Sequence, residues 1–165
     1  RGATLQALQT HGWRVRSSQG PLQAAAVVSD SPAALGPQDA VIIAVKGPAL
    51  DALAPTLRPM IAPHTLIVPA MNGVPWWFCS RTPGFEGHPL RSVDPGGRIG
   101  QALPIDQVVG CVVHGSASTP EPGVVDHRMG KGLILGRPFG SVHGTKAGDG
   151  IDALNRLCSL SLIHI

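Results

Sequence analysis

The stretch VPAMNGVPWW, residues 68–77, decides the fold, because it carries a buried run of the chain through an Asn-Gly corner. Asn-Gly is the strongest short hairpin signal when the flanking strands alternate apolar and polar residues. Residues 65–70 do not alternate but are almost continuously apolar, as in a strand covered on both faces of a parallel sheet. Pro75 suits the first position of a helix. The stretch therefore predicts a strand-to-helix turn, the place where α/β proteins bind ligands.

A second buried strand precedes this corner. Residues 40–45 (AVIIAV) are apolar and largely β-branched, as in a central parallel strand. Pro48 can open a helix between the two strands, and Pro55 must kink that helix or cut it short. Its apolar face is formed by Leu50, Leu53, Ala54 and Leu57. Strand, helix and strand form a right-handed βαβ unit, which predicts that the two strands are neighbours and parallel.

Shorter signals flank this unit. Residues 12–17 alternate as a small strand, and residues 24–28 (AAAVV) are a second candidate that could pair with it as a hairpin. An amphipathic helix is predicted to begin at Asp149. Short strand candidates separated by Gly-Pro turns predict a partly antiparallel extension of the sheet, and they span residues 90–93, 108–114, 123–126 and 132–135.

Composition excludes several function classes. With 43% hydrophobic and 14% charged residues, the 165-residue chain can build the core of one domain. Its net charge of +3 comes from scattered residues without a basic stripe, so we expect neither nucleic acid nor membrane as a partner. No apolar run approaches the roughly 20 residues of a membrane span. The protein is therefore expected to be soluble.

The metal-ligating residue types are scattered as well. Cys79, Cys111 and Cys158 include no Cys-x-x-Cys pair, which argues against a zinc site and against a disulfide framework. The seven histidines never stand in His-x-x-x-His spacing, so no metal site is expected. Cysteine usage of this kind favours a reducing, cytoplasmic location.

Two polar residues follow the two buried strands and form the candidate site. Lys46 directly follows residues 40–45, and Asn72 lies two residues beyond residues 66–70. Adjacent parallel strands are about 4.8 Å apart, so both side chains should leave the same carboxyl edge, where open α/β sheets bind ligands. An ammonium and a carboxamide there suit an anionic or carbonyl-bearing ligand. The alternative is that Lys46 is a solvated strand-end charge and Asn72 only tolerates the backbone of the turn.

Other motifs favour structural roles. Trp76 and Trp77 are expected to pack, with one of them covering the core, because consecutive helix residues point in different directions. Residues 130–132 (GKG) lack the remaining P-loop residues and predict a β-turn, as does the stretch DPGG at 94–97. Ser116 and Ser118 lack a nucleophile elbow, and His114 is expected to be a strand-edge residue. No catalytic residue is assigned.

Taken together, several stretches resemble the ketopantoate reductase (2-dehydropantoate 2-reductase) family, in the order of that family over residues 1–137. They are RGATLQAL, DAVIIAVKGPALDAL, TLIVPAMNGVPWWF, LRSVDPGG, VVGCVVHGSAS, EPGVVDH and GLILGRP. The resemblance implies a Rossmann-like doubly wound α/β sheet, mostly parallel with a partly antiparallel extension and truncated at both ends. Residues 1–145 would form a partial dinucleotide-binding domain and residues 146–165 its last helix with a tail unlike the family, while the family's helical C-terminal domain is absent.

The resemblance also implies a cofactor and a reaction, namely hydride transfer from NADPH to a 2-keto acid, ketopantoate. Arg1 matches the arginine that meets the 2′-phosphate of NADP, a role that fits a guanidinium fork. Lys46 and Asn72 match positions at the cofactor and the reacting centre. Ser116 stands where the family usually has alanine beside the cofactor, and His114 stands where tyrosine is common.

Two family segments are missing from the chain. The family's Gly-x-Gly-x-x-Gly loop would precede Arg1, and its catalytic lysine belongs to a Lys-x-x-x-Asn helix that would follow residue 165. Lys131 and Lys146 stand in no such motif, so the chain is expected to be an inactive fragment of the enzyme. Two alternatives remain open: a non-catalytic nucleotide-binding Rossmann module, and another NADP-dependent hydroxyacid dehydrogenase.

Overall fold

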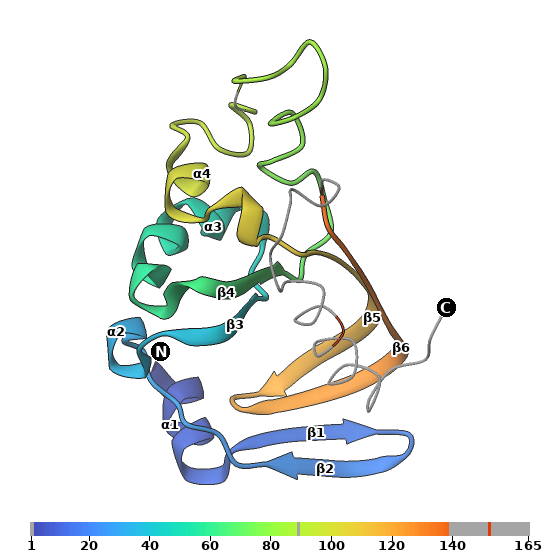
Figure 1. Ribbon diagram of the computed structural model, residues 1–165. Coiled ribbons are helices and arrows are strands. Elements are labelled where there is room, and N and C mark those ends of the chain that lie inside the picture. Colours follow the sequence, from blue (N-terminus) through green and yellow to red (C-terminus); the bar gives the residue numbers. More distant parts are fainter. Residues whose placement is uncertain (1, 89, 139–151, 153–165) are drawn as a thin grey trace.

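The computed structural model describes residues 2–88, 90–138 and 152 (Figure 1). The elements in chain order are α1 (Gly2–His11), β1 (Trp13–Ser17), β2 (Gly20–Ala24), α2 (Pro32–Leu35), β3 (Gln38–Ile43), α3 (Gly47–Leu53), the 3-10 helix η1 (Ala54–Met60), β4 (Ile61–Pro69), α4 (Arg98–Ala102), the 3-10 helix η2 (Ile105–Gln107), β5 (Gly110–Glu121) and β6 (Val124–Gly136). No helix in the described part of the chain is long and apolar enough to cross a membrane.

The predicted βαβ unit is confirmed. Strands β3 and β4 pair in parallel, with Ile43 opposite Pro69, and α3 followed by η1 connects them. Pro48 stands in the first turn of α3. The α-helix gives way to a 3-10 helix at Ala54, just before Pro55. Proline lacks an amide hydrogen and crowds the preceding turn, which explains why the α-helix stops there.

The remaining strands form the mixed extension of the sheet. Strand β5 lies beside β4 through two isolated parallel bridges, Ile67 with Val108 and Ala70 with Cys111. A second sheet has the order β2-β1-β6-β5, in which β5 and β6 are antiparallel and β6 and β1 are parallel. In Figure 1, the long β5 and β6 ribbons connect the β3–β4 unit to the β1–β2 hairpin. This mixture confirms the predicted α/β class with a partly antiparallel extension.

Two predicted strand positions were wrong, and two other candidates proved to be one strand. The hairpin exists, but its second strand is Gly20–Ala24 rather than residues 24–28, because the tight turn pairs Ser17 with Gly20 and so uses the earlier residues. Val27, from the apolar run, is 89% exposed. Residues 90–93 form turns instead of a strand, and the amide groups of Val93 and Asp94 both donate to the Leu90 carbonyl. The candidates at 123–126 and 132–135 are parts of one strand, β6.

Gly130 shows why β6 continues through the predicted β-turn. The turn expected at residues 130–132 is instead an irregularity inside the β5–β6 ladder, where the register shifts between His114 and Ser116. Gly130 has φ +75°, and a Cβ there would lie 2.5 Å from the His114 carbonyl oxygen. A bulge of this kind inserts an extra residue into one strand, and glycine permits the positive φ and the close approach.

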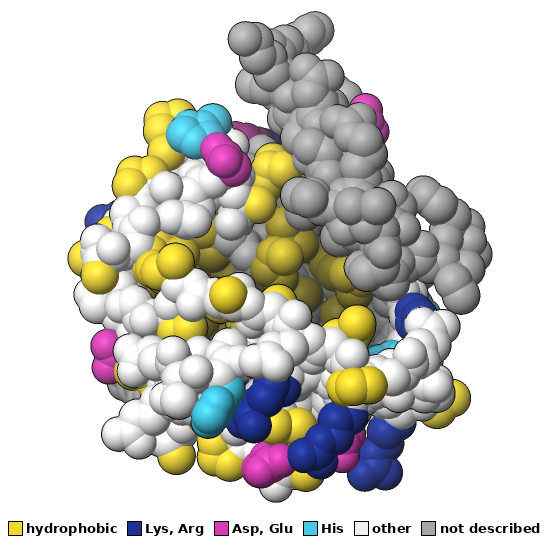
Figure 2. Space-filling model, turned by 90° about the horizontal axis from the view of Figure 1, so that it is seen from below, with side chains coloured by type: hydrophobic (Ala, Val, Ile, Leu, Met, Phe, Trp, Pro, Cys, Tyr) yellow, Lys and Arg dark blue, Asp and Glu magenta, His cyan; other side chains and the backbone are white. Residues whose placement is uncertain are grey.

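Strand β4 has buried side chains on both faces, as its continuous apolar sequence predicted. Ile67 is 0% exposed and belongs to the larger core cluster, whereas Val68 is 2% exposed and packs with Val109 and Cys111 in a second cluster. The larger cluster contains Val41, Ile43, Leu50, Ala54, Leu57, Ile67, Trp76, Trp77, Ile99, Ala102, Leu103 and Val108. Figure 2 shows hydrophobic side chains gathered in a hollow of the face seen from below, with charged side chains along one margin.

The helix predicted from Asp149 lies outside the described residues, except for Asp152, which is helical.

Candidate functional site

The Asn-Gly corner leaves the carboxyl end of β4, as predicted, but it does not lead into a helix. Residues 76–81 form consecutive turns, in which the amide of Phe78 donates to the Pro75 carbonyl at 3.1 Å and the amide of Ser80 donates to the Trp77 carbonyl at 2.9 Å. Adjacent residues of a helix do not face the same side. The turns instead allow both Trp76 and Trp77 to be buried, so the helix predicted from Pro75 was wrong.

The two indoles pack against each other. Their ring centroids are 4.3 Å apart and their planes are at 87°, an edge-to-face arrangement favoured by aromatic rings. Trp76 and Trp77 both belong to the larger core cluster, which confirms the expected packing role and extends it to the second tryptophan. The Nε1 atom of Trp76 is buried without a hydrogen-bond partner in the described part of the structure.

Asn72 joins β4 to β5 through its side chain. Its Nδ2 atom donates to the Val113 carbonyl at 3.0 Å, and its Oδ1 atom accepts from the Val113 amide at 2.9 Å. The carboxamide therefore replaces the backbone of a paired strand residue and continues the β4–β5 contact beyond Ala70. This role is more than tolerance of the turn. Asn72 is solvent-exposed and keeps one N–H and acceptor capacity for a ligand.

Lys46 leaves the same edge of the sheet. It lies three residues beyond Ile43, just as Asn72 lies three residues beyond Pro69, and Ile43 and Pro69 are register partners in the parallel pair. The Lys46 side chain is exposed, and its carbonyl accepts the Ala49 amide at 2.9 Å as α3 begins. The backbone register thus brings the two predicted residues to one edge, although Lys46 is not among the residues that line the pocket there.

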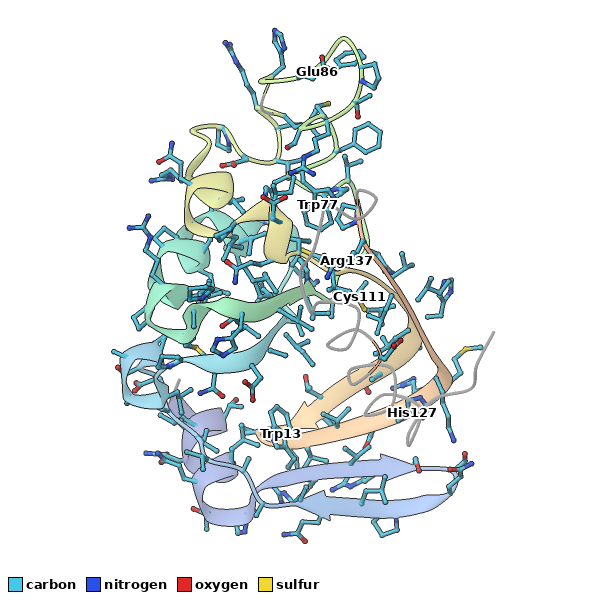
Figure 3. All side chains as sticks on the ribbon, viewed as in Figure 1. Trp13, Trp77, Glu86, Cys111, His127 and Arg137 are labelled. Atoms are coloured by element: carbon cyan, nitrogen blue, oxygen red, sulfur yellow. The ribbon has the colours of Figure 1, made fainter. Side chains whose placement is uncertain are left out.

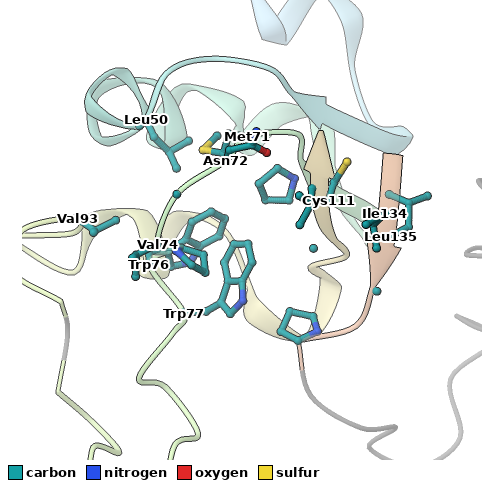
Figure 4. A pocket seen from close by; sticks show the side chains of 18 of the residues that line it. Leu50, Met71, Asn72, Val74, Trp76, Trp77, Val93, Cys111, Ile134 and Leu135 are labelled. Atoms are coloured by element: carbon teal, nitrogen blue, oxygen red, sulfur yellow. The ribbon is translucent and has the colours of Figure 1, made fainter. Parts of the chain in front are cut away.

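A pocket of about 700 Å³ opens at this edge (Figure 4). It is bounded by the start of α3, the corner after β4, the loop around Ser92, the start of β5 and the end of β6. In Figure 4, Trp76 and Trp77 lie across the pocket from Cys111, Ile134 and Leu135, with Met71 and Asn72 on a further side. The polar side chains that line the pocket are Asn72, Ser92 and Arg137, the last being its single charged lining residue among those described.

Sequence reasoning missed Arg137. Its position immediately after the apolar run GLILG is the same signal that identified Lys46, a cation at a strand end. However, an antiparallel pairing was needed to know that this end of β6 lies beside the start of β5, since Gly136 is the partner of Gly110. Figure 3 shows Arg137 beside Cys111 and below Trp77.

The other predicted cofactor residues are not brought into the pocket. Arg1 lies outside the described residues. Ser116 is exposed in β5 opposite Met129, and neither Ser116 nor His114 lines the pocket. Within the described ranges, no group of three His, Cys, Asp or Glu side chains could hold a metal ion.

Asp94 organises the loop that closes the pocket near Ser92. Its buried carboxylate accepts the Ile99 amide at 3.1 Å and the Gly100 amide at 3.0 Å, and it so caps the short helix α4. The DPGG turn was predicted, but α4 was not. Arg98 of α4 also forms a two-pronged salt bridge with Asp51 of α3, including an Nε–Oδ1 hydrogen bond of 3.0 Å. Hydrogen bonding and charge attraction from Asp51 raise the pKa of Arg98 above its usual value.

Comparisons with known proteins agree on one family. Residues 1–76 match the family described as "Ketopantoate reductase PanE/ApbA". The chain is 38% identical over 145 residues to a 2-dehydropantoate 2-reductase of Mesorhizobium japonicum, an alignment that covers 85% of this chain and 43% of the relative.

Solved structures extend the similarity to three dimensions. A protein assigned as a ketopantoate reductase from Ralstonia solanacearum MolK2 superposes with a TM-score of 0.85 at 45% identity, covering 98% of this chain and 50% of that one. The 2-dehydropantoate 2-reductase of Porphyromonas gingivalis W83 shares the fold, with a TM-score of 0.70, 24% identity, and coverage of 98% and 49%. The chain spans about half the length of the relatives it matches.

Proposed function

We propose that the chain is a member of the ketopantoate reductase family, which residues 1–76 match, and that it forms the cofactor-binding part of an oxidoreductase that uses NADPH to reduce a 2-keto acid. The observation that carries the proposal is the pocket at the carboxyl edge of β3 and β4, which is where open α/β sheets bind nucleotides. We further propose ketopantoate reduction in pantothenate biosynthesis as the reference reaction of the family, with reduction of another 2-keto acid by an NADP-dependent hydroxyacid dehydrogenase as the alternative, and the cytoplasm as the location.

The residues at this edge suit the nicotinamide end of a dinucleotide. Flat indole surfaces and the apolar side chains of Met71 and Cys111 offer contacts to a planar ring, and the remaining N–H of Asn72 can bind a carbonyl oxygen. Bound NADPH would supply the hydride. We propose Lys46 and Asn72 as cofactor contacts at this end, and Arg1 and Ser116 as contacts farther along the nucleotide.

The proton for the reduced oxygen must come from another group. Asn72 does not ionise, the hydroxyl of Ser92 is a very weak acid, and the guanidinium of Arg137 does not release its protons. The polar side chains described in the pocket therefore hold and orient a substrate without protonating it. Because the lining residues orient the substrate but do not protonate it, we propose that a residue beyond the pocket lining acts as the general acid. It also keeps a second function in view, a nucleotide-binding module without turnover.

Binding of the dinucleotide to this chain tests the proposal. Trp76 and Trp77 line the pocket, while Trp13 lies well away from Trp77, near the β1–β2 hairpin, in Figure 3. We expect NADPH to quench the indole fluorescence of a Trp13→Phe variant, and the Asn72→Ala change to weaken that binding. Arg1→Ala should weaken NADPH binding far more than NADH binding. Absence of any saturable NADPH signal in the Trp13→Phe variant would refute the assignment.

A further inference from the structure

We propose, on the basis of the function proposed above, that the 2-keto acid taken by this pocket carries a bulky apolar substituent, aromatic or branched, and that Arg137 binds its carboxylate. The assignment distinguishes this substrate class from compact or hydroxylated 2-keto acids. It follows from the lining of the pocket, the charge of that lining, and the way its side chains are fixed.

The lining is predominantly apolar. Beside the two indoles, the pocket is lined by the side chains of Met71, Val74 and Ile134. A volume of about 700 Å³ lies within the usual range for ligand pockets and leaves room for a nicotinamide ring together with a substrate larger than pyruvate. Burial of apolar substrate surface here strengthens binding, whereas burial of a substrate hydroxyl without a hydrogen-bond partner weakens it.

The charge of the lining selects an anion. Arg137 is half-buried and forms no ion pair or side-chain hydrogen bond with another described residue. No described Asp or Glu side chain lines the pocket to compete for it. A guanidinium presents two parallel N–H donors that match the two oxygens of a carboxylate. A 2-keto acid bound in this way has its substituent directed among apolar side chains, because the other polar side chains of the lining are only Asn72 and Ser92.

The aromatic wall formed by the two tryptophans is fixed, which allows it to discriminate between ligands. Trp76 and Trp77 hold each other edge to face and are both buried in the core cluster. The Asn72 carboxamide is held by two hydrogen bonds to Val113, so it cannot rotate freely to meet a substrate hydroxyl. Rigid walls do not close around a small ligand, so a small ligand makes few van der Waals contacts with them.

Calorimetric titration of the 165-residue chain, saturated with NADPH, tests the substrate class. The probes are pyruvate, ketopantoate, 4-methyl-2-oxopentanoate and phenylpyruvate. We expect the last two to bind about tenfold or more tightly than the first two, in line with the selectivity of apolar pockets for added methylenes. Equal affinity for all four, preference for ketopantoate, or no binding of any acid would overturn the inference.

Two variants assign the roles within the pocket. Arg137→Ala should weaken phenylpyruvate at least tenfold and remove its advantage over phenylpyruvamide, which lacks the carboxylate. Trp77→Phe, which keeps an aromatic core residue, should weaken the binding of phenylpyruvate more than that of pyruvate and so reduce the preference between them. An Arg137→Ala variant that still discriminates acid from amide would contradict the assigned carboxylate site.

The NADPH titration separates the two proposals. If NADPH binds but ketopantoate is the preferred acid, the substrate class is wrong and the reductase function stands. If NADPH does not bind at all, the proposed function itself fails.

Discussion

Replacing Asn72 with alanine removes the two hydrogen bonds that join the corner after β4 to Val113 of β5. Each such bond contributes about 0.5–1.5 kcal/mol net, and solvent exposure of Asn72 favours the lower half of the resulting range, so we expect a loss of about 1–2 kcal/mol in the free energy of unfolding. For a chain of this size that corresponds to a fall in Tm of about 2–8 °C.

Urea denaturation followed by circular dichroism measures this loss. Gln9→Ala is a matched control, because Gln9 is an exposed amide in α1 whose side chain forms no hydrogen bond with another described residue. Asn72→Asp should destabilise at least as much as Asn72→Ala, since it keeps the acceptor for the Val113 amide but places a second carboxylate oxygen against the Val113 carbonyl. If both variants of Asn72 unfold like the parent, the carboxamide does not hold β5, and Asn72 serves only the turn or a ligand.

Three further substitutions probe features that position the pocket. Asp94→Ala leaves two amide groups of α4 without their carboxylate acceptor, and it should lower the free energy of unfolding by about 1–3 kcal/mol, as measured by thermal or urea denaturation. Partial recovery of stability in Asp94→Asn would show that the role is hydrogen bonding rather than charge. Gly130→Ala should lower Tm more than Gly84→Ala, because both have positive φ but only Gly130 would also clash with a backbone carbonyl; equal losses would mean that the bulge can relax. A double-mutant cycle on Asp51 and Arg98 should give a small coupling that diminishes as salt is added, and a coupling unaffected by salt would argue against a solvent-screened pair.

The parts of the fold that the sequence predicted are those with strong local signals. The apolar runs of β3 and β4 are long, and both are bounded by prolines or glycines whose backbone preferences are strict. Parallel pairing then follows from the short helical connection, and it places Lys46 and Asn72 at one edge without any knowledge of side-chain contacts. The polar pair could therefore be recognised before the structure.

The parts that could not be predicted depend on contacts between distant segments. Asp94 caps α4 from outside that helix, so no pattern within residues 98–102 reveals it. Both tryptophans are buried because the chain turns tightly after Pro75, which overrides the helix preference of that position. Arg137 reaches the pocket only through the antiparallel pairing of β6 with β5.

The seam between β1 and β6 has a consequence for synthesis of the chain on the ribosome. Arg14 of β1 donates to the carbonyl of Pro122, a partner 108 residues later in the sequence. At elongation rates of about 5–20 residues per second, the nascent hairpin waits about 5–20 seconds for the strand that completes it. During this interval one edge of the hairpin is open to pairing with other chains. Mutations that slow the pairing of β6 with β1 should therefore lower the yield of soluble protein even where they leave the free energy of unfolding unchanged.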